Sequence, residues 1–208
     1  MAQIKPDILS KISDTEYYSN EQAYESIDKK NSLQILGRFE GLWDGEVDDA
    51  VRNAKKICYH DRGGDHNDYL YLVYNLNNYP VLDSMATKMG FEIKKYKAQI
   101  QMQLPGCLMS VHVDPKWKWD LMYPGYQNRC VQVLIMLTDW EPGQLLGFDN
   151  KILTNWDKGD IIYCDYLTTY HYTANCSAAR RPLLQISGVA NQNLLANITN
   201  KEFRILSV

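Results

Sequence analysis

The pattern of apolar and polar positions changes character near residue 90. Before that point the spacing is mostly helical. Acidic side chains come early and lysines late in residues 45–56, as the helix dipole favours. Pro80 suits the first turn of a helix and Gly90 suits its C-cap. Three helical segments are therefore predicted, at residues 21–29 (which Asp14 could cap), 45–56 and 81–88.

After residue 90 the pattern predicts strands. Residues 93–104 alternate loosely and end at Pro105-Gly106, a turn signal. The expected strands lie at residues 93–104, 108–113, 130–137, 144–148, 160–164, 171–174 and 182–189. Many short strands with regular turn signals favour an antiparallel sandwich or barrel over a βαβ fold. We expect a mainly β fold with N-terminal helices (α+β) and a single domain overall, with a helical region at 1–90 packing on a β core at 91–208.

Length and charge narrow the classes of function. A chain of 208 residues fits one domain. Its net charge of −3 lacks the basic footprint that phosphate-backbone binding requires, so a nucleic-acid partner is not expected. No segment approaches 18 continuous apolar residues and the N-terminus has no apolar signal region, which predicts a cytoplasmic protein without a membrane span. Five scattered cysteines without a CxxC pair argue against a disulfide framework and a thiolate zinc site.

The strongest chemical signal comes from two of the four histidines. His112 and Asp114 stand at the end of a predicted strand, where a period of two puts both side chains on one face. His171 begins a later strand, and the antiparallel strands between Asp114 and His171 could return the chain to the same place. Two neutral imidazoles and one carboxylate on one face of a metal leave three positions open, which suits Fe(II) with a bidentate co-substrate and O₂. Taken alone, this pattern is weak evidence.

The surroundings of His171 strengthen the pattern. Trp156-Asp-Lys-Gly-Asp160 precedes it, Asn175 follows it, and Arg180-Arg181 comes next. With the HxD unit, these features make residues 93–190 resemble the Fe(II)/2-oxoglutarate-dependent dioxygenases. The similarity is greatest to small prolyl- or aspartyl/asparaginyl-hydroxylase-like members, some of them viral. It implies a double-stranded β-helix (jelly-roll, cupin-like) core, and the host cytoplasm as location if the chain is viral.

The resemblance also implies roles for particular residues. His112, Asp114 and His171 would hold the iron. Arg181 would bind the distal carboxylate of 2-oxoglutarate, with Arg180 as the alternative because neighbours on a strand face opposite ways. The candidates for a further polar residue beside the co-substrate are Gln101, Gln103 and Arg129. The implied activity is hydroxylation of an unactivated C–H bond in a small-molecule, amino-acid or peptide substrate. Halogenating relatives lack the carboxylate, so Asp114 favours hydroxylation.

Other interpretations stay open. A nucleobase-oxidising relative would need a basic groove, against which the net charge speaks. A cupin-like metal-binding protein or enzyme could keep the fold without using 2-oxoglutarate, and a binding module could keep it without turnover. The polar run at residues 58–68, with His60 and His66, is either a loop or lid or a second metal site. Residues 115–124 form either a surface loop or a substrate-recognition loop. The sequence gives no indication of oligomeric state.

Overall fold

The computed structural model describes residues 33–58, 69–73, 76–114, 121–149, 151–166 and 169–208. Residues 33–208 form one compact unit. The helix predicted at 21–29, the run from His60 to Asp68 and most of the segment at 115–124 lie outside the described residues. No helix in the described part of the chain is long and apolar enough to cross a membrane.

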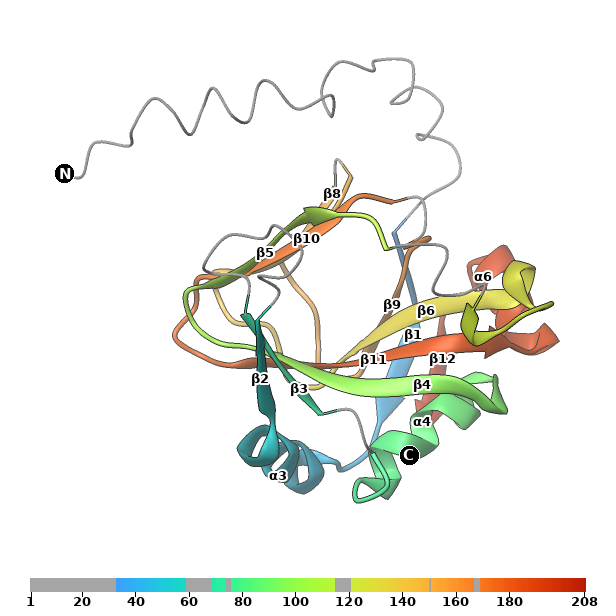
Figure 1. The fold of residues 1–208 in the computed structure, drawn as a ribbon, viewed down its shortest axis with the longest axis horizontal. Coiled ribbons are helices and arrows are strands. Elements are labelled where there is room, and N and C mark those ends of the chain that lie inside the picture. Colours follow the sequence, from blue (N-terminus) through green and yellow to red (C-terminus); the bar gives the residue numbers. More distant parts are fainter. Residues whose placement is uncertain (1–32, 59–68, 74–75, 115–120, 150, 167–168) are drawn as a thin grey trace, which may run out of the picture. The chain divides into compact units, whose positions relative to one another are not determined.

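Two β-sheets form the framework (Figure 1). The larger has the order β12 (Arg204–Ser207), β1 (Gln34–Glu40), β9 (Asp160–Tyr163), β6 (Cys130–Met136), β11 (Arg181–Ala190), β4 (Phe91–Gln103), β3 (Tyr69–Val73) and β2 (Lys55–Cys58). The smaller has the order β5 (Cys107–His112), β10 (His171–Asn175), β7 (Gln144–Phe148) and β8 (Lys151–Leu153). The described pairs are antiparallel, apart from the parallel pair of β1 and β12.

Alternation along the strands builds a separate core on each face of the large sheet. On β6, Val133 and Ile135 belong to an outer core, while Leu134 and Met136 belong to an inner one. The outer core receives the apolar sides of α3 (Asp44–Asn53), α4 (Pro80–Met89) and α6 (Gln192–Asn200). The inner core lies between the large sheet and the small one, which supplies Phe148 and others. The inner face of the large sheet therefore faces the strands that carry the two candidate histidines.

The elements predicted after residue 90 are confirmed, with boundaries that shift by a residue or two. Two predicted helices are confirmed as α3 and α4. Gly90 ends α4 in the left-handed region, at φ 107°, and its N–H donates to the carbonyls of Ala86 and Thr87. Trp156 is buried in the inner core. Trp140 is partly buried and packs against this core. The fold class, mainly β with helices, is that predicted.

The expectation of a mainly helical region before residue 90 is wrong for the described residues. Strands β1, β2 and β3 lie there, and all three belong to the large sheet. In β1 the pairing register with β9 shifts between Ile35 and Gly37. As a result Leu36 and Phe39, three residues apart, both enter the outer core. A bulge of this kind breaks the period of two by which a strand is found in a sequence.

Gly159 offers a test of how tightly β1 is held against the turn before β9. Its φ is +92°, and an added Cβ would lie 2.1 Å from the carbonyl oxygen of Phe39. Gly159→Ala should therefore lower the free energy of unfolding by about 3 kcal/mol, combining backbone strain with a clash. Gly106→Ala is the matched control, because Gly106 has φ +76° but no atom within 4 Å of an added Cβ. It should cost only about 1 kcal/mol. Equal losses in urea titrations would show that the contact with Phe39 is unimportant.

Candidate metal centre

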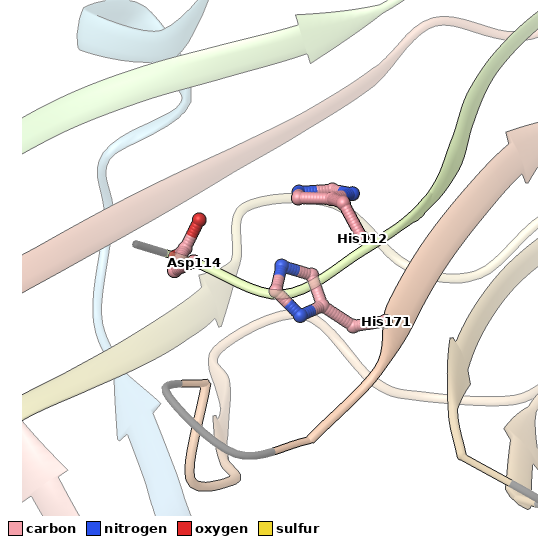
Figure 2. A group of neighbouring side chains, drawn as sticks. All are labelled: His112, Asp114 and His171. Carbon is pink, nitrogen blue, oxygen red and sulfur yellow. The ribbon is translucent and has the colours of Figure 1, made fainter. Parts of the chain in front are cut away.

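The antiparallel pair of β5 and β10 brings the candidate ligands together. In its register His171 lies opposite His112, and Asp114 follows two residues after the end of β5. The possible ligand atoms of the three side chains all lie within 4.8 Å of one another. The centroids of the two imidazole rings are 4.2 Å apart. Figure 2 shows the rings next to each other, with Asp114 on the chain that continues from β5. In this geometry all three side chains could coordinate one metal ion.

Backbone carbonyls orient both imidazoles in the same way. The Nδ1 of His112 lies 2.8 Å from the carbonyl oxygen of Ser110, and the Nδ1 of His171 lies 3.0 Å from that of Thr169. A neutral imidazole that donates from Nδ1 to a carbonyl keeps the lone pair of Nε2 free. Both rings are thus held in the tautomer that coordinates a metal through Nε2.

Burial favours the neutral form of His171. Burial lowers the pKa of its imidazole, and the neighbouring His112 lowers it further. The ring of Tyr166 packs edge-on against His171, with centroids 4.9 Å apart, and limits its rotation. Burial also raises the pKa of the Tyr166 phenol well above its usual value, so this neighbour stays uncharged. An uncharged His171 is the form that a metal ion requires.

The Asp114 carboxylate is held by a relay that the sequence analysis missed. Its Oδ2 accepts a hydrogen bond from the Gln132 Nε2 at 3.0 Å. The Gln132 Oε1 in turn accepts from the Ser187 hydroxyl at 2.7 Å, which fixes the direction of the amide. The Asp114 N–H also donates to the carbonyl of Tyr166. A polar residue inside the apolar run CVQVLIM of β6 was the signal that could have found Gln132.

Arg181 is a buried cation close to this cluster. It is 1% exposed on β11, and its guanidinium donates to the Leu145 carbonyl at 2.8 Å, to the Gln103 Oε1 at 2.6 Å and to the Thr173 hydroxyl. Thr173 stands two residues after His171 on β10, a step of about 7 Å along a strand. The buried guanidinium is thus bound to a residue that lies two positions along β10 from a candidate metal ligand.

No carboxylate of the described residues forms an ion pair with Arg181. Its partners are all neutral, and its Nε has no hydrogen-bond partner in the described part of the chain. Burial accordingly lowers the pKa of the guanidinium to about 9. A buried cation without a counter-ion is unfavourable, and an anion entering from outside would relieve it.

The other predicted site residues separate into two groups. Gln103 contacts Arg181 directly, and Gln101 lies two residues before it on the same face of β4. Arg180 is exposed, because it precedes Arg181 and faces the other way. Arg129 lies at the opposite end of β11, where it donates to the carbonyl of Ala190 and pairs with a glutamate at the start of β4. The structure therefore excludes Arg180 and Arg129 from this site.

No protein-family model and no curated protein sequence matches the chain. Solved structures do. A prolyl hydroxylase from Trichoplax adhaerens, in complex with a peptide fragment of the hypoxia inducible factor oxygen degradation domain, is 15% identical over 93% of this chain and 97% of its own, with a TM-score of 0.52. A prolyl-4-hydroxylase from Pseudomonas putida is 12% identical over 81% and 97%, with a TM-score of 0.51. A non-heme α-ketoglutarate-dependent epimerase from nogalamycin biosynthesis is 10% identical over 70% of each chain, with a TM-score of 0.51.

At such low identity these similarities establish the fold. The two sheets form the double-stranded β-helix, or jelly roll, that the sequence resemblance implied.

Proposed function

We propose that this chain is an Fe(II)- and 2-oxoglutarate-dependent dioxygenase that hydroxylates an unactivated C–H bond of an amino-acid or peptidyl substrate. One observation carries the proposal. A His-Asp-His cluster of metal-ligating geometry includes His171, and Thr173, two residues further along β10, contacts a buried arginine that lacks a counter-ion in the described part of the chain. The similarity to hydroxylases of the same fold supports it by analogy.

The donor set fits Fe(II). Two imidazole nitrogens and one carboxylate oxygen bind one face of an octahedral metal and leave the opposite face open, the arrangement typical of non-haem iron oxygenases. The three side chains are half-buried, so a metal ion and small ligands could reach them. None of the three makes an ion pair within the described residues that would compete with a metal.

The surroundings of Arg181 fit the distal carboxylate of 2-oxoglutarate. An arginine fork matches a carboxylate with two parallel hydrogen bonds, and such charge-assisted bonds are strongest where water is excluded. The Gln103 and Thr173 side chains hold the guanidinium in place without neutralising it. A dicarboxylate that chelates a metal with one end needs an anion site of this kind at the other.

With Fe(II), 2-oxoglutarate and O₂ bound, the cofactor chemistry converts 2-oxoglutarate to succinate and CO₂ and places one oxygen atom in the substrate C–H bond. The side chains of this protein supply the geometry. Backbone carbonyls hold the His112 and His171 rings through Nδ1, Gln132 holds the Asp114 carboxylate, and Arg181 would set the direction of the co-substrate. Tyr166 of the inner apolar core packs against His171 and would keep water from that side of the site.

The proposal is tested by mixing the metal-free protein with Fe(II) and 2-oxoglutarate under anaerobic conditions. A visible charge-transfer band, followed by succinate formation when O₂ is admitted, is the expected result. Bound Fe(II) without the band would refute 2-oxoglutarate dependence and leave a cupin-like metal protein. Absence of Fe(II) binding would refute the metal site itself.

A further prediction concerns the relay behind Asp114. Gln132→Leu should weaken Fe(II) binding by roughly 10- to 100-fold, because outer residues that orient a metal ligand have effects of this size. Ser187→Ala should have a smaller effect, since it frees the Gln132 amide to rotate but keeps its donor. Fe(II) titration with a competing chelator measures both, and the thermal midpoint of each metal-free variant serves as the control. Unchanged Fe(II) affinity in Gln132→Leu would show that Asp114 needs no support.

A further inference from the structure

A row of polar side chains crosses the inner face of the large sheet beside Asp114. The row, here called the glutamine strip, consists of Gln99 and Gln101 on β4, Gln185 and Ser187 on β11, and Gln132 on β6. The strand registers place Gln185 opposite Gln99 and Ser187 opposite Gln132. Since Gln132 donates to the Asp114 carboxylate, the strip begins at the candidate metal centre.

The strip faces the interior of the barrel but keeps access to solvent. On β11, alternate residues share a face, so Gln185 and Ser187 lie on the same side as Leu183. Leu183 is buried in the inner core beneath the small sheet, whereas Gln185 and Ser187 are half-buried. Gln99 and Gln101 are half-buried as well. Beyond the part covered by the small sheet, these polar side chains of the inner face are therefore partly accessible.

The hydrogen bonds within the strip leave part of its capacity unused. The Gln185 Oε1 accepts from the Gln99 Nε2 at 2.8 Å and from the Gln101 Nε2. Within the described residues, this leaves the Gln185 Nε2 and the Oε1 atoms of Gln99 and Gln101 without a partner. Because these three side chains are half-buried, the unused atoms are partly accessible and could bond to a ligand. The unused atoms themselves are uncharged donors and acceptors.

We propose that the glutamine strip binds an uncharged amide group of the substrate; this inference rests on the proposed function and names the substrate chemistry of the same site. An amide offers one acceptor and at least one donor, so it pairs reciprocally with a glutamine amide. A carboxylate offers acceptors only, and an apolar group would leave the strip's polar atoms without water or partner. Lys97, the next residue on this face of β4, is exposed, so a preference for acidic ligands would indicate that Lys97 dominates instead.

The amide could come from a peptide bond or from a side-chain carboxamide, and the probes separate these sources. Capped pentapeptides carrying asparagine, aspartate or leucine at the centre test the carboxamide. A leucine peptide with one central amide replaced by an ester tests the peptide bond. Each is titrated anaerobically into protein loaded with Fe(II) and 2-oxoglutarate, and its dissociation constant is read from the shift of the charge-transfer band.

Binding of the asparagine peptide at least about ten-fold tighter than its aspartate and leucine counterparts would assign a carboxamide ligand, since burying an unpaired polar group costs this much. A similar loss on ester replacement would assign a peptide bond. Equal binding of all four probes, tighter binding of aspartate, or no binding would overturn the inference, while the band in the wild type still upholds the proposed function. Absence of the band in the wild type would overturn both.

Variants of the protein test whether the glutamine strip causes the preference for an amide. Gln185→Leu should reduce the preference for the amide to less than about two-fold. Gln192→Leu, an exposed glutamine on α6, is the matched control and should keep the full preference. If Gln185→Leu does not fold, Gln99→Leu removes an acceptor from the edge of the strip and should lower the same preference. A full amide preference in either strip variant would show that the amide binds elsewhere.

Discussion

Replacing His171 with alanine should abolish Fe(II) binding at the candidate centre, because the two remaining side chains do not bind the metal tightly enough. Succinate formation should fall by about 1000-fold or more, since it requires the bound metal. His112 and Asp114 stay in place in this variant, since the Ser110 carbonyl and Gln132 hold them independently of His171. The loss of activity should therefore come from the loss of the metal and not from unfolding. His171 is only half-buried, so its removal should cost little folding stability.

The measurement is Fe(II) stoichiometry and succinate release in the wild type and the variant, with the thermal midpoint of the metal-free proteins as the control for folding. The midpoints should agree to within a few degrees while the iron is lost. An alanine variant that still binds one Fe(II) and turns over 2-oxoglutarate would place the metal elsewhere in the chain. A large drop in the midpoint would mean that His171 acts through packing against Tyr166.

The sequence identified the candidate ligands through the HxD spacing together with the resemblance of residues 93–190 to a known family. A period of two put His112 and Asp114 on one face, and the turn signals located β5 and β10 to within a residue or two. The pairing that sets His171 opposite His112 depends on a long-range register, which alternation alone does not determine. The expectation that the three side chains meet therefore came from the resemblance, and the register of β5 and β10 supplies its structural basis.

The choice between two adjacent arginines illustrates the same limit. Alternation requires that only one of Arg180 and Arg181 faces inward, but it does not say which one. The pairing of Arg181 with Gln103 across β11 and β4 decides this in the structure. Gln132 was missed because its role depends on a partner in a distant loop.

Two other elements were missed for reasons of local sequence. Helix α6 is short, and its N-cap residue Asn191 follows directly from β11, so its signal merged with that of the strand. Strand β12 is four residues long and mostly exposed, and it lacks the buried alternation by which strands are recognised.

Replacing Arg181 with methionine should raise the KM for 2-oxoglutarate by roughly 100-fold, because it removes the cation of a desolvated charge pair while keeping most of the side-chain volume. Fe(II) binding should persist, since no metal-ligand candidate contacts Arg181. The variant thus separates co-substrate anchoring from metal binding, which His171→Ala does not. Arg180→Met is the matched control, because Arg180 is exposed one residue away and its loss should leave the KM unchanged.

The thermal midpoint gives a second and independent measure of the same interaction. A buried guanidinium whose pKa is lowered to about 9 destabilises the co-substrate-free fold while it is charged, which is its state near neutral pH. Arg181→Met removes this cost but leaves the Thr173 hydroxyl oxygen without a donor and the Gln103 Oε1 with only the Thr173 hydroxyl, so the two effects oppose each other and the midpoint should change by only a few degrees. In the presence of Fe(II), the wild type at 100 times its Kd for 2-oxoglutarate should gain about 2.7 kcal/mol of stability. The methionine variant should gain almost none at that concentration. Equal stabilisation of both proteins would show that the distal carboxylate binds elsewhere and would remove the main support for 2-oxoglutarate as the co-substrate.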